Sequence, residues 1–388
     1  MSGEPLYDPV ANPFAPGAGT PPPSLVGRDG ELETARVALA RTSAGRSAQH
    51  LLLHGLRGVG KTVLLRAVAR MAEHDRYHLL QVVGDPRGDA VGSLLRQTTR
   101  ILADAQPTPK VRRALQVLKS VSVSLGVAEV SVDIARPPAL GRSGAVAEDL
   151  SELLVALAAA VADDGAGVAI MVDEAQALPL DQLAAVLGAL HAGGQQQLPL
   201  WGAMAGLPNL LGRAAKAKTY AERMFTVAEL GPLDGASASA AVRDPAEELG
   251  VSLSKPALDA IVTASGGYPY FLQTFAYHIW NVARDDPISR ADVTRARPAV
   301  QRALDDAFFA ARVARVPESE RRYLRAMATL GPGPHPSSAI AGALGTTTPG
   351  VGAIRDRLIT DGVIYSPSYG FVTFALPLLD DYLRRTGT

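Results

Sequence analysis

One stretch of the chain has residue types and spacing suited to holding phosphate groups. The apolar run Leu51-Leu52-Leu53 leads into a glycine-rich turn that ends in Lys61-Thr62, and a helical pattern follows. This is the pattern G-x-x-x-x-G-K-[ST] between a strand and a helix. Glycines let the backbone wrap closely around phosphates, and the amides of the loop and of the helix start point at the anion. The residues expected to bind phosphate are Gly55, Gly58, Val59, Gly60, Lys61 and Thr62.

Two of these residues have specific chemical roles. Lys61 adds a mobile positive charge beside the phosphates, and Thr62 offers its hydroxyl to Mg²⁺. The alternative interpretation is a glycine-rich turn that only joins a core strand to a core helix. The fixed spacing in its strand-loop-helix setting favours nucleotide binding, with ATP and Mg²⁺ as the expected cofactors.

A second candidate for chemistry is the acidic pair Asp173-Glu174, which ends the apolar run Val168–Val172. Such a run is typical of a buried parallel strand, whose carboxyl end faces the crevice where α/β sheets bind ligands. The pair follows the phosphate loop by about a hundred residues, so we expect Asp173 to hold hydrated Mg²⁺ and Glu174 to polarise the attacking water. The alternative is a core strand that ends in two solvated acids.

The composition limits the class of protein. The 388 residues predict two to three domains, and the absence of cysteine excludes disulfides, thiol nucleophiles and Cys-ligated zinc. The seven histidines are scattered, so we expect no metal other than nucleotide-bound Mg²⁺. Basic and acidic residues balance at 38 each, so DNA binding must depend on a local patch. No apolar run is long enough to span a bilayer, and the N-terminus lacks a signal peptide; we expect a cytoplasmic protein with no membrane partner.

Strands alternate with helices through the first two thirds of the chain. This alternation predicts an α/β fold with a doubly wound parallel sheet. Residues 1–24 are rich in proline and glycine and predict an extended arm. The alternation of apolar residues in 120–134 predicts an inserted β-hairpin, to which we assign no function. The expected strands are the run before the phosphate loop, residues 77–83, 168–174 and 198–205, and a run that ends at Leu230.

The order of these motifs resembles AAA+ P-loop ATPases, in particular the Orc/Cdc6-like initiators and the STAND or archaeal-type ATPases. The resemblance rests on Val26-Gly27-Arg28, the loop at 55–62 (Walker A), the strand at 168–174 (Walker B) and Arg223 before the last core strand. It implies a sheet in the order 5-1-4-3-2, a nucleotide contact from Val26, and Arg223 as an arginine finger for a neighbouring subunit. Arg223 could instead be a surface residue at a helix end. Such ATPases usually sense the γ-phosphate with a polar residue near the fourth strand. Here that strand offers only Ala203, Met204 and Ala205, with Asn209 further on, and we assign no sensor.

The C-terminal part of the chain resembles the remaining parts of such ATPases. A helical lid is expected over 234–312 after a core at 25–233, and its Gly267-Tyr268-Pro269 is similar to the STAND motif in which a proline approaches the nucleotide. The alternative is that these three residues only begin a helix, with two aromatic side chains packed below it. Residues 313–388 resemble a winged helix-turn-helix, in which Arg355, Arg357 and Tyr369 are the candidates for DNA contact. Within residues 318–385, seven arginines against six acids give a charge of only +1. Winged helices also act as protein-binding or autoinhibitory modules.

Two functions follow from this resemblance. The first is a slow, regulatory ATPase that acts as a nucleotide-dependent switch, shares sites between subunits of a homo-oligomer and touches double-stranded DNA through the winged helix. The second is a STAND-like signalling ATPase, in which the winged helix is autoinhibitory or binds a protein partner. A scaffold without turnover is disfavoured because Lys61, Thr62, Asp173 and Glu174 are all present.

Overall fold

The structure is a computed structural model that describes residues 5–17, 19–124 and 145–387. The described residues form two compact units. The first, called the sheet unit below, comprises Arg28–Gly55 and Lys61–Glu229. The second, called the helical unit, comprises the described parts of Met1–Gly27, Leu56–Gly60 and Leu230–Thr388. The four-part division into arm, core, lid and winged helix stays a prediction.

A five-stranded sheet in the order β2-β3-β4-β1-β5 organises the sheet unit. This is the predicted order 5-1-4-3-2 read from the other edge, so the predicted fold class is confirmed. Residues in β3 pair in parallel with both β2 and β4, and β4 also pairs in parallel with β1. The strands are β1 (His50–Gly55), β2 (Tyr77–Val83), β3 (Gly167–Asp173), β4 (Leu200–Gly206) and β5 (Phe225–Leu230).

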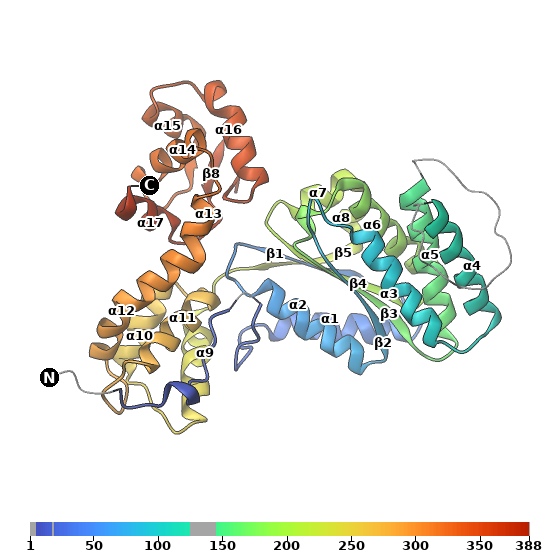
Figure 1. Cartoon of the computed structure of the whole chain (residues 1–388), viewed down its shortest axis with the longest axis horizontal. Coiled ribbons are helices and arrows are strands. Elements are labelled where there is room, and N and C mark those ends of the chain that lie inside the picture. Colours follow the sequence, from blue (N-terminus) through green and yellow to red (C-terminus); the bar gives the residue numbers. More distant parts are fainter. Residues whose placement is uncertain (1–4, 18, 125–144, 388) are drawn as a thin grey trace. The chain divides into compact units, whose positions relative to one another are not determined.

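Burial along the strands explains their sequence patterns. Every residue of β4 and all but the last of β3 are buried, as expected for inner strands covered on both faces. The edge strand β2 instead alternates buried and exposed positions. Helices α1 and α2 pack on one face of the sheet and α3, α5 and α6 on the other (Figure 1). The helices are α1 (Asp29–Ser43), α2 (Lys61–His74), α3 (Ala90–Asp104), α4 (Pro109–Ser124), α5 (Ala145–Ala162), α6 (Leu180–Gln195), α7 (Leu210–Ala217) and α8 (Ala221–Met224).

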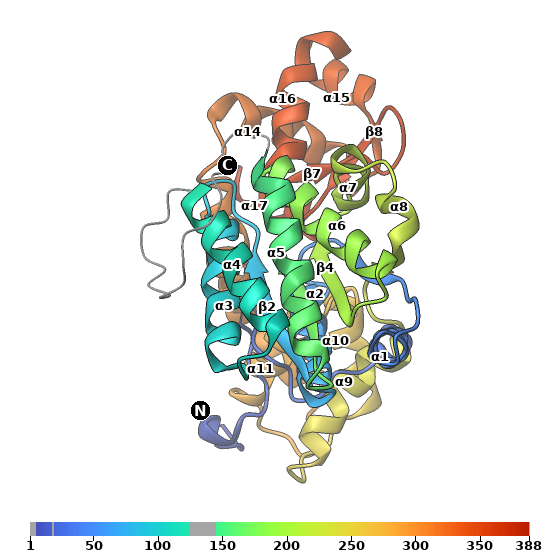
Figure 2. The ribbon, with the colours of Figure 1, turned by 90° about the vertical axis from the view of Figure 1, so that its right-hand side faces the viewer.

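Part of the hairpin expected over 120–134 is replaced by helix. Helix α4 continues to Ser124, so residues 120–124 are helical, and the rest of the expected hairpin lies outside the described residues. The apolar residues Ala114, Leu118 and Val121 of α4 are buried, a spacing of three to four residues that fits one face of a helix. Helix α4 packs beside α5, as Figure 2 also shows.

The helical unit begins with a bundle whose elements match the predicted lid helices. Asp234 and Ser289 cap two of them by accepting backbone N–H bonds, and Ser289 forms a capping box with Asp292. A π-helical segment (Asp305–Ala310) follows α12 directly and separates it from α13. The helices are α9 (Gly235–Glu247), α10 (Lys255–Ser265), α11 (Pro269–Trp280), α12 (Arg290–Leu304) and α13 (Ala311–Val313).

The arm predicted at the N-terminus is packed against α11 over part of its length. Phe14 is buried, and its ring lies 6.3 Å from that of Trp280. The Trp280 indole N–H donates to the Asp8 carbonyl at 2.9 Å, and the Asn12 amide donates to the Tyr277 carbonyl at 3.0 Å. The arm therefore contributes apolar surface and hydrogen bonds to the helical unit.

The last part of the helical unit, called the C-terminal subdomain below, combines four helices with a small sheet. The sheet has three strands in the order β6-β8-β7, with antiparallel pairing. Its elements are α14 (Glu318–Thr329), β6 (His335–Pro336), α15 (Ser337–Ala343), α16 (Thr348–Thr360), β7 (Ile364–Tyr365), β8 (Phe371–Phe374) and α17 (Leu379–Thr386). Among the described residues, no helix has the length and apolar character needed to cross a membrane.

Candidate functional site

The phosphate loop has the backbone that its glycines predict. Gly58 and Gly60 have φ angles of +83° and +93°, a region that side chains disfavour and glycine adopts freely. Between them Val59 is buried, with 1% of its surface exposed, and fixes the loop to the protein interior. Helix α2 begins directly after the loop at Lys61, so its first amides stand at the end of the turn.

Lys61 and Thr62 form hydrogen bonds to other residues that are expected to bind the nucleotide or its Mg²⁺. Lys61 is buried, and its ammonium donates to the Gly55 carbonyl at 2.9 Å. The Thr62 hydroxyl donates to Oδ2 of Asp173 at 2.8 Å, which joins two motifs 111 residues apart in the sequence. Burial lowers the pKa of nearby His54, an effect that Glu229 opposes and Lys61 adds to.

Glu174 directly follows β3, at the carboxyl edge of the sheet. Its backbone is left-handed, with φ of 47°, and its N–H donates to Oδ1 of Asp173 at 2.9 Å. The side-chain amide of Gln176 donates to Oε2 of Glu174 at 2.5 Å. We did not predict Gln176 as a site residue. The sequence could have indicated it, because Gln176 follows Glu174 by two residues and its side-chain amide can reach the Glu174 carboxylate.

The fourth strand has no polar side chain at the position expected for a γ-phosphate sensor. Ala203, Met204 and Ala205 are buried in β4, as the sequence indicates. Asn209 precedes α7, and its Oδ1 is buried without a hydrogen-bond partner among the described residues. Asn209 stands between the end of β4 at Gly206 and the start of α7.

Arg223 lies in the short helix α8, directly before β5. Its side chain is exposed, and no hydrogen-bond or ion-pair partner of its guanidinium is found among the described residues. Its carbonyl oxygen accepts a bond from the Gln49 amide at 3.1 Å, which fixes the backbone to the residue before β1. The guanidinium is thus accessible to a second molecule, as an arginine finger requires.

Two predicted nucleotide contacts, Val26 and Pro269, belong to the helical unit together with loop residues 56–60. Val26 is half-buried against the lid helices, and Pro269 opens α11 at its first turn. The Pro269 ring lies about 4.0 Å from the point where a Cβ on Gly60 would stand. The Tyr270 N–H donates to the Gly58 carbonyl at 3.2 Å. Pro269 therefore lies beside Gly60 of the phosphate loop.

The three candidates for DNA contact differ in their surroundings. Arg357 on α16 bonds to Oε1 of the buried Glu320 at 2.7 Å, and Arg355 pairs with Asp356 at 3.0 Å. Both guanidinium groups therefore already have carboxylate partners inside the subdomain. Tyr369, in the turn between β7 and β8, is fully exposed.

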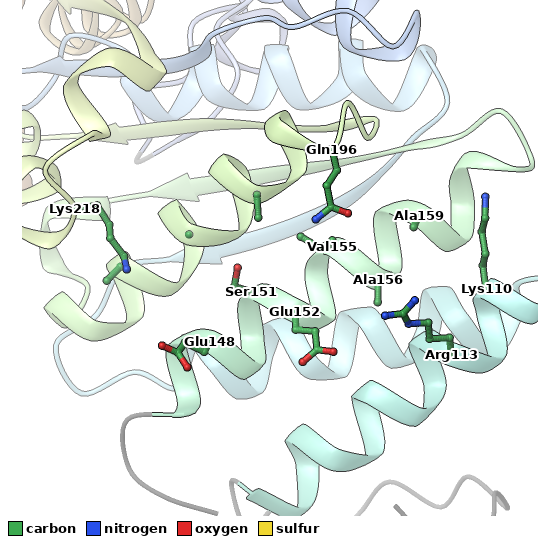
Figure 3. Close-up of a pocket in the computed structure, with 13 residues that line it drawn as sticks. Lys110, Arg113, Glu148, Ser151, Glu152, Val155, Ala156, Ala159, Gln196 and Lys218 are labelled. Carbon is green, nitrogen blue, oxygen red and sulfur yellow. The ribbon is translucent and has the colours of Figure 1, made fainter. Parts of the chain in front are cut away.

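A cavity of about 520 Å³ lies among α4, α5 and α6, and none of the predicted site residues lines it (Figure 3). Small residues from α5 and α6, such as Ala156 and Gly188, form its wall, and Lys110 at its edge pairs with Asp163 at 2.6 Å. The figure shows Glu148 and Glu152 on α5 with Arg113 across from them on α4. This cavity is separate from the phosphate loop.

The described residues suit Mg²⁺ bound with a nucleotide better than a protein-only metal site. No cluster of three or more His, Cys, Asp or Glu side chains that could hold a metal occurs among them. The Thr62 hydroxyl and the Asp173 carboxylate meet beside the loop, and they are oxygen donors of the kind that Mg²⁺ prefers. Two protein ligands leave the remaining positions to water and phosphate, which is how Mg²⁺ is commonly bound.

Comparisons with known proteins agree with this geometry. Residues 24–202 match the family described as "AAA ATPase domain", and residues 306–383 match one described as "Domain of unknown function (DUF8462)". No curated protein matches the chain. The chain is similar to the Walker-type ATPase PABY2304 of Pyrococcus abyssi, with 16% identity, 93% of this chain and 96% of that chain covered, and a TM-score of 0.56.

Two further solved structures match with lower TM-scores. One is RuvB, the Holliday junction branch migration motor of Thermotoga maritima, with 15% identity, 92% of this chain and 95% of that chain covered, and a TM-score of 0.47. The other is the Aeropyrum pernix Orc1 protein in complex with DNA, with 17% identity, 94% of each chain covered, and a TM-score of 0.46. At 16% identity, the similarity to the Pyrococcus ATPase shows a shared fold. The predicted relation to AAA+ P-loop ATPases is confirmed by the family match.

Proposed function

Because residues 24–202 belong to the AAA ATPase domain family, we propose that this chain is a slow, cytoplasmic ATPase whose bound nucleotide acts as a conformational signal. The observation that carries the proposal is the 2.8 Å bond between the Thr62 hydroxyl and Asp173, because it joins the two nucleotide motifs at one place. ATP with Mg²⁺ is the proposed ligand, as is usual in this family.

Each residue of the loop has a proposed part in holding ATP. The amides around Gly58 and Gly60, together with the start of α2, bind the phosphates, and Lys61 neutralises part of their charge. Thr62 and Asp173 would hold Mg²⁺, which when bound supplies charge neutralisation at the phosphates. Glu174 accepts a proton from the attacking water and so acts as the general base.

Arg223 is proposed to complete the site of a second subunit. An arginine finger stabilises the charge that develops on the phosphoryl group during transfer. The exposed guanidinium of Arg223, which has no partner among the described residues, favours this role over that of a helix-end surface residue. The proposal implies a homo-oligomer that forms or tightens in the presence of ATP.

DNA is the proposed macromolecular partner of the C-terminal subdomain, which we infer to be a winged helix. Three helices followed by a strand, an exposed turn and a second strand support this inference. The exposed Tyr369 and the accessible Arg322 would contact the duplex more readily than the paired Arg355 and Arg357.

A titration of the full chain with fluorescent duplex DNA tests this partner. We expect binding in the presence of ATP that weakens steeply between low and physiological salt, because phosphate contacts release counterions. Tyr369→Ala and Arg322→Ala should each weaken it, whereas Arg36→Ala, which removes an exposed arginine of α1, should not. If no duplex binds at either salt concentration, the DNA proposal is wrong.

A second candidate function, the STAND-like switch, is favoured by contacts within the helical unit. The Arg57 N–H donates to the carbonyl of Ala375 after β8 at 3.4 Å, so the C-terminal subdomain reaches the phosphate loop. Tyr270 stacks on Phe308 with ring centroids 5.0 Å apart, and a Cβ on Gly58 would stand 3.4 Å from the Tyr270 side chain. In this function, the C-terminal subdomain keeps the loop closed until nucleotide exchange releases it.

The release rate of a fluorescent ADP analogue separates the two functions. Phe308→Leu removes the ring stacked on Tyr270 and should speed ADP release if these contacts hold the loop closed. Phe14→Leu is the matched control, because this buried ring packs against Trp280 of α11, with centroids 6.3 Å apart. Equal release rates in both variants and the wild type would rule out the autoinhibitory role.

A further inference from the structure

The side chain of Gln176 connects the proposed general base to the end of β4. Its Nε2 donates to Oε2 of Glu174 at 2.5 Å, and its Oε1 accepts the N–H of Leu207 at 3.0 Å. All three residues belong to the sheet unit. One amide group therefore fixes a carboxylate at the end of β3 relative to the backbone that follows β4.

The absence of a side chain at Gly206 leaves room for the Gln176 amide. A Cβ added to Gly206, the last residue of β4, would lie only 2.5 Å from Oε1 of Gln176. Any side chain at that position would push the amide away from Leu207. The bridge therefore depends on glycine at position 206.

Glu174 needs such support because its backbone alone does not fix its carboxylate. Its left-handed conformation is held by its own N–H bond to Asp173 and by the Ala177 N–H, which donates to the Glu174 carbonyl at 2.8 Å. These bonds leave the side-chain torsions free. A hydrogen bond from a neighbouring amide restricts them and orients the carboxylate.

The bridge also supplies the polar group that β4 lacks. The end of β4 offers only apolar side chains from Ala203 to Ala205, and the Gln176 amide occupies the space beside Leu207 directly after it. A shift of the backbone at the end of β4 would therefore move the Glu174 carboxylate through the side chain of Gln176.

We propose that Gln176 is a positioning residue that holds Glu174 in the orientation required for hydrolysis and connects it to the backbone after β4. This inference rests on the proposed function, because it assumes that Glu174 activates the attacking water. Gln176 itself need not touch the nucleotide. Its loss should therefore reduce the rate of hydrolysis and leave the binding of ATP nearly unchanged.

Two substitutions test the bridge. Gln176→Glu keeps the size of the side chain and an acceptor for Leu207, but its carboxylate cannot donate to Glu174, so it removes one of the two bonds. Gln176→Met removes both at similar volume. We expect kcat to fall about 10- to 100-fold in each variant, the range seen when supporting hydrogen bonds of a site are lost, with KM for ATP within about twofold of the wild type.

Gln97→Met is the matched control. Gln97 on α3 forms a comparable bridge, accepting the Gln81 N–H at 2.8 Å and donating to the Gln81 carbonyl at 2.9 Å, and it contacts none of the proposed site residues. We expect its kcat to match that of the wild type. If Gln176→Met fails to fold, the conservative Gln176→Glu decides the result.

The outcomes separate this inference from the function on which it rests. Wild-type kcat in the folded Gln176→Glu variant, or an equal loss in the Gln97→Met control, would overturn the positioning role alone. The proposed function fails instead if Glu174→Gln hydrolyses ATP as fast as the wild type. A fall in kcat at constant KM for both Gln176 variants supports the inference.

Discussion

Acid should destabilise the sheet unit through one buried histidine. His50 opens β1, has 6% of its surface exposed and packs edge-on against Phe225 at 5.9 Å. Burial lowers its pKa from the ordinary 6.5 to about 4; a backbone hydrogen bond at Leu190 opposes this effect, and the charge of His191 adds to it. The neutral ring therefore fits the fold, and the charged ring does not.

The sign and size of the effect follow from this lowered pKa. The stabilisation by neutral His50 is fully present above the unfolded-state pKa of 6.5 and is lost as pH falls towards the folded-state value of about 4. Between pH 7 and pH 5 the loss amounts to about 2 kcal/mol, since each unit of pKa difference corresponds to about 1.4 kcal/mol.

Urea unfolding followed by the fluorescence of Trp201 measures this loss. Trp201 is buried in β4, and its indole N–H donates to the Gln49 carbonyl beside β1 at 3.0 Å. The background substitution Trp280→Phe removes the other tryptophan of the chain. We expect the free energy of unfolding to fall by about 2 kcal/mol more between pH 7 and pH 5 in this background than in its His50→Leu variant.

Phe225→Leu is the control for packing. It alters the contact with His50 and leaves the titrating ring in place, so it should lower the free energy of unfolding at both pH values and retain the pH dependence. If His50→Leu and its parent lose the same free energy between pH 7 and pH 5, the reasoning about His50 is refuted.

Three further predictions concern the arm, the nucleotide site and the sharing of sites between subunits. Phe14→Ala should cost about 3 kcal/mol of unfolding free energy, because it empties a buried site against Trp280; a loss below about 0.5 kcal/mol in urea unfolding would mean that the arm is not packed. Lys61→Ala should weaken ATP binding about 10- to 150-fold, through loss of a charge-assisted hydrogen bond worth about 1.5–3 kcal/mol. Arg223→Ala subunits and Lys61→Ala subunits should each be inactive alone. An equal mixture of the two should restore up to about a quarter of the wild-type turnover, since one in four neighbouring pairs then combines an intact loop with an intact finger. If the mixture stays inactive, Arg223 does not act across subunits.

The fold was predictable because its signals are local and strong. A continuous apolar run such as β3 predicts a parallel strand that is covered on both faces, and β3 is buried in this way. The phosphate loop fixes the start of α2, and β2 begins and ends where the pattern predicts. The alternation in 120–134 was misleading at its start, since Val121 also continues the buried face that Ala114 and Leu118 form on α4.

The candidate site was only partly predictable. Residue types and spacing indicated Lys61 and Asp173, whose roles depend on fixed distances along the chain. The contact of Gln176 with Leu207 depends on how β3 and β4 lie side by side, which spacing does not encode. The ion pair of Arg357 with Glu320 likewise joins residues 37 positions apart and could not be read from the charge of the segment.

The comparison of ATP hydrolysis by the wild type and Glu174→Gln tests the central claim most directly. The variant keeps the shape of the side chain and every group that binds phosphate, but an amide cannot accept a proton from water. We expect it to bind ATP as tightly as the wild type and to lose hydrolysis. Unchanged turnover in Glu174→Gln, or a wild-type chain that does not bind ATP, would contradict the account.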